Sequence, residues 1–128
     1  YVRDHCSAIH LILENGKIGE TYNIGGLNQL TNTDVVLKLC DILDGLKPSQ
    51  NRNISSYREL IQFVEDRPGH DRRYGINPKK IEEELGWRPT ETFDTGILKT
   101  VKWYLEHKEW VEQVKSGEYR RKPEELIK

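Results

Sequence analysis

The stretch Glu20-Thr21-Tyr22-Asn23-Ile24-Gly25-Gly26 decides the fold class of this chain. Its β-branched and aromatic residues predict a short strand from residue 20 to residue 24, which the two glycines end. Helical patterns lie on both sides, and this order is typical of α/β proteins. A single strand cannot satisfy its own backbone groups. The sequence leaves two partners open: strands on chain outside these 128 residues, or a ribbon with a second short strand at residues 61–65.

Helical periodicity covers most of the remaining chain, so the expected fold is α/β and rich in helix. The first helix runs from residue 2 to residue 14, and Asn15-Gly16 is expected to end it in the left-handed conformation. In the second helix, Thr31 and Asp34 have the spacing of a capping box, and Gly45 with Pro48 closes it. The faces expected to be buried are Val2, Cys6, Ile9 and Leu13 in the first helix, and Val36, Leu39, Cys40, Leu43 and Leu46 in the second.

Two further helices are expected in the second half of the chain. Asn77-Pro78 starts one that stops at Gly86, with Asn as the cap and Pro at the first helical position. Asp94 is expected to cap a longer helix, and a last segment covers residues 109–115. The buried face of the longer helix is expected to consist of Ile97, Val101, Tyr104 and Leu105.

Composition excludes several classes of function. The net charge is −1, from 20 basic and 21 acidic residues, so the chain lacks the positive field of a nucleic-acid-binding protein. No apolar run approaches the roughly 20 residues that a membrane helix needs. The histidines lack the spacing of metal ligands. Cys6 and Cys40 lie among apolar neighbours, which favours reduced core thiols in a cytoplasmic protein over a disulfide or a reactive thiol.

The densest group of charged residues is Asp66-Arg67-Pro68-Gly69-His70-Asp71-Arg72-Arg73-Tyr74. Guanidinium groups match pairs of phosphate oxygens, and Gly69 lets the backbone approach a ligand closely. The segment fits a diphosphate site, but a solvated loop with internal Arg–Asp pairs fits the same residues. Asn32, near the start of the second helix, either offers its amide to a ligand or caps the helix. Gly25-Gly26 before that helix is only a weak signal for anion binding.

Residues 66–74 strongly resemble the corresponding segment of the dTDP-glucose 4,6-dehydratases, which belong to the extended short-chain dehydrogenase/reductase family. Related epimerases and decarboxylases keep an Arg-Pro-Gly-Asp-like version, and His70 before Asp71 points to the dehydratase branch. The resemblance runs in order from Tyr1 to about Gly117. It is carried further by Tyr1-Val2-Arg3-Asp4-His5, Glu20-Thr21-Tyr22-Asn23-Ile24-Gly25-Gly26, Asp34-Val35-Val36, Leu85-Gly86-Trp87-Arg88-Pro89, Glu91-Thr92-Phe93, Gly96-Ile97, Lys99-Thr100-Val101, Trp103-Tyr104-Leu105 and Trp110-Val111.

The resemblance implies the C-terminal part of an extended short-chain dehydrogenase. Residues 1–24 would complete its NAD-binding Rossmann domain, residues 25–117 would form most of a sugar-nucleotide substrate domain, and residues 118–128 would be a charged tail. The sequence has no Met and begins directly with a helical pattern, so we expect it to be part of a longer protein. This expectation favours strand partners that lie outside the chain.

The resemblance also implies the chemistry. The family oxidises C4 of dTDP-glucose with bound NAD, eliminates water across C5–C6 and returns the hydride to C6. Its catalytic residues and its NAD-binding loop would precede this chain, so no catalytic, cofactor-binding or metal-binding residue is expected here. Arg67 resembles the family's diphosphate ligand, His70 lies beside it, and Asn32 matches a substrate-contacting asparagine.

The parent enzyme is then expected to be a cytoplasmic, homodimeric lyase that binds a dTDP-sugar and contacts neither nucleic acid nor membrane. The chain alone would be inactive, and would self-associate or pair with the missing N-terminal part. Two other hypotheses remain: a fragment of a related UDP-sugar epimerase or decarboxylase, and a helical interaction module without a ligand. Tyr104 and Lys108 have the spacing of a short-chain dehydrogenase catalytic pair, but they fall in a late amphipathic helix and are assigned to that helix's core and surface.

Overall fold

The computed structural model describes residues 1–51, 53–69 and 75–117. Within these ranges the chain forms five α-helices and one short 3₁₀ helix, and no β-strand. The elements in chain order are α1 (Val2–Asn15), α2 (Asn32–Leu46), η1 (Tyr57–Leu60), α3 (Lys79–Leu85), α4 (Phe93–Glu106) and α5 (Lys108–Ser116). None of these helices is long and apolar enough to cross a membrane.

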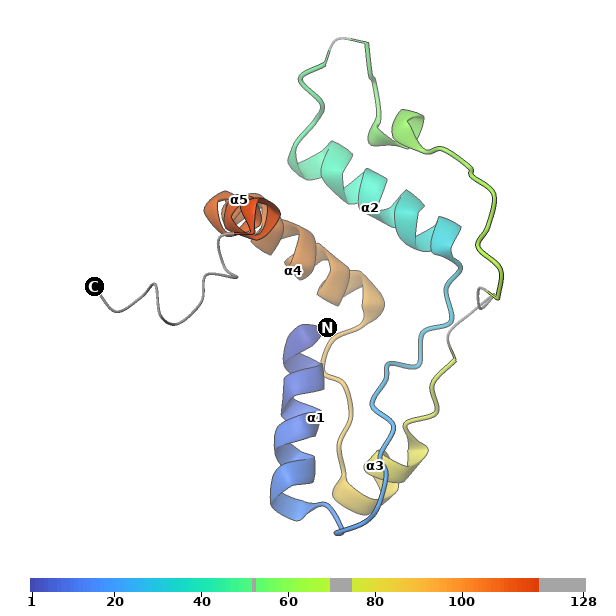
Figure 1. Cartoon of the computed structure of the whole chain (residues 1–128), viewed down its shortest axis with the longest axis vertical. Coiled ribbons are helices and arrows are strands. Elements are labelled where there is room, and N and C mark those ends of the chain that lie inside the picture. Colours follow the sequence, from blue (N-terminus) through green and yellow to red (C-terminus); the bar gives the residue numbers. More distant parts are fainter. Residues whose placement is uncertain (52, 70–74, 118–128) are drawn as a thin grey trace, which may run out of the picture.

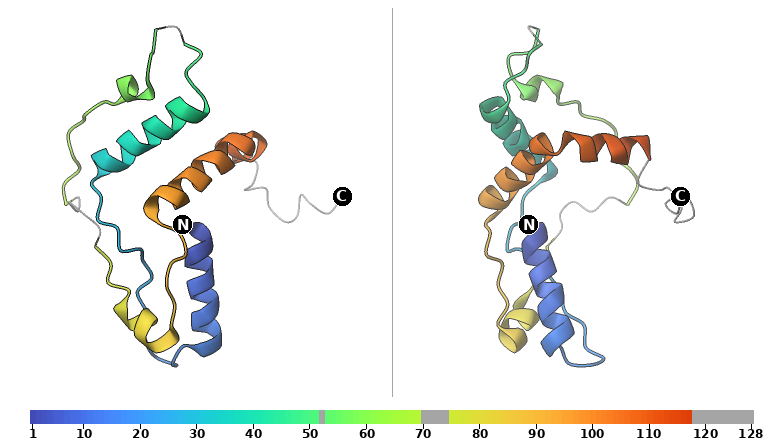
Figure 2. Two further views of the ribbon diagram at one scale, coloured as in Figure 1. Left: turned by 180° about the vertical axis from the view of Figure 1, so that it is seen from behind. Right: turned by 90° about the vertical axis from the view of Figure 1, so that its left-hand side faces the viewer.

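The helices pack in two groups (Figure 1). In the first, which we call the α1–α3 unit, α1 packs against α3. In the second, the α2–α4 unit, α2 packs against η1 and α4, and α4 packs against α5. Among the described elements, no helix of one unit packs against a helix of the other. Non-helical segments run between the units, as both views in Figure 2 show.

The α1–α3 unit has a small apolar core. Ala8 of α1 and Ile81 of α3 are fully buried, and Trp87 is nearly so. The Trp87 indole N–H donates a hydrogen bond of 3.0 Å to Ser7 Oγ, so its one polar group is satisfied. Partly buried side chains complete the core: Leu11, Ile12, Tyr22, Ile24 and Leu85.

In the α2–α4 unit, α2 is the central element. Arg58 of η1 donates from Nε and Nη2 to the two carboxylate oxygens of Asp41, at 2.7 Å each, which is a bidentate pair. Asp44 accepts hydrogen bonds from the Ser56 hydroxyl at 2.5 Å and the Tyr57 backbone N–H at 2.9 Å. These bonds fix η1 on α2.

The two predicted strands are wrong for this structure, since neither residues 20–24 nor residues 61–65 form a strand. The reason is that no described segment offers either one a backbone ladder, and the ribbon between them does not form. Residues 20–24 are held by side chains instead: the Tyr22 hydroxyl donates to Glu84 at 3.0 Å. Phe63 and Val64 are 86% and 84% exposed, so residues 61–65 bury neither of these apolar side chains.

The face of α1 expected to be buried is also exposed. Val2 is 66% and Leu13 is 80% exposed, and Cys6 and Ile9 are exposed as well. The opposite side, with Asp4 and Ala8, turns towards the rest of the molecule. The helix therefore has a second apolar face that no described residue covers. The expectation of a core thiol is confirmed for Cys40, which is buried, and is wrong for Cys6.

Side chains set the helix starts, mostly as the sequence indicates. The capping box at α2 is confirmed: Asp34 N–H donates to Thr31 Oγ1 at 3.1 Å, and Thr31 N–H donates to Asp34 Oδ2 at 3.0 Å. At α4, however, Thr92 is the cap instead of Asp94, because Thr92 Oγ1 accepts from the Thr95 N–H. Asp94 instead forms an ion pair of 2.7 Å with Lys38, which links α4 to α2.

Helix ends follow the prediction less closely. Gly86 ends α3 in the left-handed conformation, at φ 70°, as expected. Gly16 ends α1 in an extended conformation, so the left-handed end predicted there is wrong. A Cβ at Gly16 would lie 2.4 Å from the carbonyl oxygen of Ile12, and this close approach explains the glycine. Gly45 lies inside α2, which continues to Leu46.

The late helical region divides at His107, which separates α4 from α5. Tyr104 was expected to be buried but is 49% exposed, because its ring packs edge-on against Trp103 on the surface. His107 stacks on Trp103 with ring centroids 4.3 Å apart. Tyr104 lies in α4 and Lys108 begins α5, so the expectation that one late helix holds both residues is wrong, although each occupies a helix position.

Candidate functional site

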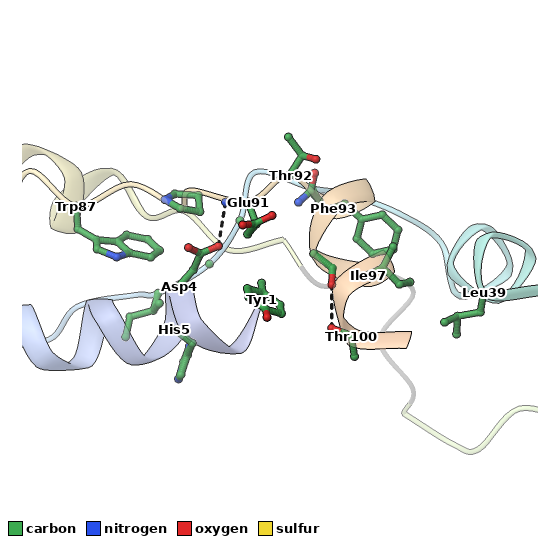
Figure 3. A pocket seen from close by; sticks show the side chains of 16 residues that line it. Tyr1, Asp4, His5, Leu39, Trp87, Glu91, Thr92, Phe93, Ile97 and Thr100 are labelled. Carbon is green, nitrogen blue, oxygen red and sulfur yellow. Dashed lines mark hydrogen bonds between the residues drawn. The ribbon is translucent and has the colours of Figure 1, made fainter. Parts of the chain in front are cut away.

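A cavity of about 430 Å³ lies where the two units meet (Figure 3). Its walls come from the start of α1, the start of α4, the segment at residues 24–28 and one residue of α2, Leu39. Apolar side chains, among them Trp87, Phe93 and Ile97, make up much of the wall. The polar groups at its edge include Asp4 and Glu91, which Figure 3 shows next to each other.

Asp4 is the buried charge of this region, with only 5% of its surface exposed. One carboxylate oxygen accepts hydrogen bonds from the Thr90 N–H at 3.0 Å and the Thr90 hydroxyl at 2.6 Å. The other accepts from the Glu91 N–H at 3.1 Å. Burial alone would raise the pKa of Asp4, but these hydrogen bonds and the N-terminal charge outweigh it and lower the pKa.

Glu91 extends this polar group towards α4. Its carboxylate forms an ion pair with Lys99, and the hydrogen bond from Lys99 lowers the pKa of Glu91. The Lys99 ammonium lies 5.9 Å from the centroid of the Tyr1 ring. Residues from both units therefore meet here through polar side chains and one aromatic ring.

Asn32 is the first residue of α2 and is exposed. Because Thr31 caps the helix, the alternative in which Asn32 is the cap does not hold. The Asn32 amide therefore lies at a helix N-terminus, where backbone N–H groups and the helix dipole favour anions. Asp34 lies in the same turn and opposes that preference.

Arg67 is exposed, and its backbone N–H donates to Asp66 Oδ1 at 2.8 Å. Its guanidinium forms no hydrogen bond or ion pair with any residue that the structure describes, so among these residues nothing competes with a ligand for its donors. His70, the third residue of the predicted site, lies outside the described residues, as do residues 71–74.

The chain after this segment returns close to α2. A Cβ placed on Gly75 would lie 3.9 Å from Nε2 of Gln29, three residues before Asn32. Ile76 packs closely on Gly25: a Cβ placed on Gly25 would lie 2.7 Å from the Ile76 side chain. Residues 75–76 therefore run beside residues 25–29. Neither Arg67 nor Asn32 lines the cavity between the units.

The described residues favour binding over chemistry. No group of three or more acidic, histidine or cysteine side chains among them is arranged to hold a metal ion. The shifted pKa values belong to groups engaged in hydrogen bonds or ion pairs within the chain, such as Asp4 with Thr90 and Asp41 with Arg58. What the described residues offer a ligand is the exposed guanidinium of Arg67 and the Asn32 amide at a helix N-terminus.

Comparison with known proteins identifies the family. A family model described as GDP-mannose 4,6 dehydratase matches residues 1–100. The chain belongs to this family. The dTDP-glucose 4,6-dehydratase of Shigella flexneri is 57% identical to it over 119 residues, which are 93% of this chain and 32% of that enzyme. The enzyme of the same name from Neisseria meningitidis serogroup B is 47% identical over 120 residues, covering 94% of this chain and 34% of that enzyme.

Solved structures agree with the sequence matches. The dTDP-glucose 4,6-dehydratase of Bacillus anthracis in complex with NAD superposes with a TM-score of 0.67 at 43% identity, over 85% of this chain and 31% of that one. The Streptomyces venezuelae enzyme with NAD and TYD bound gives a TM-score of 0.67 at 40% identity, over 84% and 30%. The chain thus spans about a third of the length of these relatives and matches their C-terminal part. The resemblance and the fold class inferred from the sequence are confirmed.

The sequence did not lead us to Asp4 as a functional candidate. Asp4, Ala8 and Leu11 have the i, i+4, i+7 spacing of one helix face, and this face is the more buried one. That spacing was the feature of the sequence that could have indicated a buried position for Asp4. Its partners are 86 and 87 residues away in the chain, so their identity depends on the tertiary structure.

Proposed function

We propose that this chain is the C-terminal, substrate-binding region of an NAD-dependent dTDP-glucose 4,6-dehydratase, a lyase that acts in the cytoplasm. The observation that carries the proposal is 47–57% identity, over 93–94% of the chain, to enzymes of that name. In this proposal Arg67 and His70 bind the diphosphate of a dTDP-sugar and Asn32 contacts the substrate. Two observations support it: the Arg67 guanidinium is exposed and has no partner among the described residues, and the Asn32 amide is exposed.

The described residues do not fit NAD. A dinucleotide diphosphate is typically held at a helix N-terminus that directly follows a glycine-rich turn. Here residues 27–31 separate Gly25-Gly26 from α2, and the side chains of Thr31 and Asp34 already accept the N–H groups at the start of that helix. The Asp34 carboxylate would also repel phosphate. We therefore assign no catalytic or NAD-binding residue to the described part of this chain.

The proposed domain boundaries follow the same division. Residues 1–24 would complete the dinucleotide-binding domain, and residues 25–117 would form most of the substrate domain. Two observations support this: the apolar face of α1 is uncovered, and residues 20–24 lack a strand partner in the described structure. A Rossmann sheet would supply both, with helices on its faces and parallel strands at its edge. Residues 118–128, proposed as a charged tail, lie outside the described residues.

The role of Arg67 is tested in a chimera that places the 119 matching residues of this chain in the Shigella flexneri enzyme, in place of the segment they match. Replacing Arg67→Ala removes up to two charge-assisted hydrogen bonds to phosphate, so the Kd for dTDP should rise at least tenfold by calorimetry. Arg3→Ala is the matched control, since Arg3 lies on α1, and it should leave the Kd within twofold. Competition with UDP and GDP checks the nucleotide.

An unchanged Kd in the Arg67→Ala chimera would contradict the diphosphate role. Preference for UDP over dTDP would instead favour a related epimerase or decarboxylase. Competition with GDP is included because the matching family model is described as GDP-mannose 4,6 dehydratase. The identity to dTDP-glucose enzymes predicts that dTDP competes best.

We also propose that the 128-residue chain self-associates, or pairs with the N-terminal part of such an enzyme, and that the parent enzyme is a homodimer. Large exposed apolar side chains on α1 and at Phe63-Val64 support the first statement. Sizing chromatography of the chain alone should show oligomers whose size increases with concentration. A compact monomer that melts sharply, with a Tm that dTDP does not shift, would favour the helical interaction module instead.

A further inference from the structure

We propose that Asp4 is a positioning residue: it fixes the α2–α4 unit relative to α1, and so determines where Asn32 lies and where the segment that leads to Arg67 begins. The binding roles of these two residues rest on the function proposed above. The orientation of the units does not, because it can be measured without any ligand.

Apart from Asp4, Tyr1 also connects the units, through its contacts with Lys99 and Gly96. No described helix of one unit packs against a helix of the other, and the cavity of about 430 Å³ lies at the boundary. The three hydrogen bonds of Asp4 connect the first turn of α1 to Thr90 and Glu91, the residues that lead into α4. The close approach of Tyr1 to Gly96, where a Cβ would lie 3.2 Å from Tyr1 Cβ, adds a nearby contact.

From Glu91 the connection continues through rigid parts. Thr92, the next residue, caps α4, and the ion pair of Glu91 with Lys99 ties the lead-in segment to the second turn of the same helix. Helix α4 packs against α2, with an ion pair between Asp94 and Lys38. A rotation at residues 90–91 would therefore carry α2 with it.

Helix α2 carries Asn32 and holds the element that precedes Arg67. Asn32 is its first residue. The bidentate pair between Arg58 and Asp41 fixes η1 on α2, and residues 61–66 lead from η1 to Arg67. The position of Asn32 relative to α1 thus depends on how residues 90–91 are held, and so does the point at which the segment leading to Arg67 begins.

The chemistry of the contact requires a carboxylate. Three donors converge on Asp4, and each oxygen accepts at least one hydrogen bond. An asparagine has the same shape, but its NH₂ group would face one of these N–H donors, which would lose its partner. Leaving a buried donor unsatisfied is costly, so Asp4→Asn should loosen the contact without changing the volume of the side chain.

The orientation is measured by spin-label distances in the full 128-residue chain with Cys40→Ala, mixed with an excess of unlabelled chain so that labels on associated copies do not contribute. The inter-unit pair joins a label on the native Cys6, which is exposed on α1, to a label at Gly45→Cys on α2, where a Cβ meets nothing within 4 Å. The intra-unit pair joins the label on Cys6 to a label at Glu83→Cys on α3. The variants compared are Asp4→Asn, Thr90→Val, Thr90→Ser, and the charge control Glu14→Gln on the same helix.

Asp4→Asn should at least double the width of the distance distribution of the inter-unit pair and leave that of the intra-unit pair unchanged. Thr90→Val should broaden the inter-unit distance distribution less than Asp4→Asn does, because the backbone N–H groups of residues 90 and 91 still donate to Asp4. Thr90→Ser should keep the original width because it keeps the hydroxyl. Unchanged widths in Asp4→Asn would overturn the proposal. Broadening of both pairs would also overturn it, because Asp4 would then be needed for the α1–α3 packing itself.

The consequence for binding is tested in the chimera with dTDP as the probe. Asp4→Asn should raise the Kd at least fivefold, and Glu14→Gln should leave it unchanged. An unchanged Kd together with a broadened inter-unit distance would overturn the link from Asp4 to the ligand-binding residues. If the unsubstituted chimera does not bind dTDP, the proposed function fails, whereas the distances still decide whether Asp4 orients the units.

Discussion

Asp4 and Arg67 show how the surroundings of a charged residue determine its use. Asp4 is buried and all its described partners belong to the chain, so its charge serves the structure. Arg67 is exposed, and among the described residues its guanidinium has no partner that would compete with a ligand. Both are charged residues within short stretches that match the same family, and the sequence does not distinguish these roles.

The hydrogen bonds of Asp4 predict a pH dependence of stability. Because its pKa in the folded chain lies below the ordinary value of 3.8, the unfolded chain takes up the proton first as the pH falls. The stabilisation from Asp4 is therefore complete above the unfolded pKa of about 3.9 and is lost as the pH falls through the lower folded value. The free-energy difference between wild type and Asp4→Asn, from urea unfolding, should be constant from pH 7 to 5 and shrink below pH 4.

Subtracting the variant isolates Asp4 from other carboxylates with lowered pKa values, such as Asp34 and Glu84. Glu14→Gln, which removes an exposed carboxylate from the same helix, controls for net charge. A difference between wild type and Asp4→Asn that stays constant down to pH 2.5 would contradict the assignment of these hydrogen bonds to the ionised form.

At the scale of elements, helices are predictable where their signals are local. The box of Thr31 and Asp34 and the glycine at position 86 lie within four residues of the backbone groups that they satisfy. The start of α4 was predicted two residues too late, because Asp94 and Thr92 are both acceptable caps by sequence. The structure distinguishes them, since only Thr92 accepts the hydrogen bond from the Thr95 N–H.

This assignment predicts a difference between two neighbouring substitutions. Thr92→Ala removes the cap of α4 and should lower the free energy of unfolding by about 1 kcal/mol. Asp94→Ala removes one side of an exposed ion pair with Lys38 and should cost about 0.5 kcal/mol or less, a cost that salt reduces further. Urea unfolding at low and high salt measures both. A larger loss in Asp94→Ala than in Thr92→Ala would show that Asp94 is the cap after all.

Neither predicted strand forms in the described structure, and the reason also concerns whole elements. A strand depends on a partner that the local sequence does not specify, whereas a helix satisfies its own backbone. Residues 20–24 have the composition of a strand, but no described segment pairs with them. The exposed stripe of Val2, Cys6, Ile9 and Leu13 has the same origin, because the 3.6-residue period shows that a face is apolar without showing what covers it.

At the scale of the whole molecule, the sequence predicted helices α1 to α4 and, by resemblance, the family. It did not predict two units with a cavity between them, because that arrangement depends on contacts such as Asp4 with Thr90, 86 residues apart. Nor did it predict which side of α1 is buried, since Asp4 is polar and the apolar stripe lies opposite. Long-range partners of polar groups were the missing information in each case.

The chimera with the 119 matching residues of this chain in the Shigella flexneri enzyme tests the central claim most directly. The measurement is the conversion of dTDP-glucose to dTDP-4-keto-6-deoxyglucose, followed by mass spectrometry, with dTDP binding measured in parallel. Our account predicts that the chimera binds dTDP and turns over at a rate within tenfold of the parent enzyme. A folded chimera that does not bind dTDP would contradict the account.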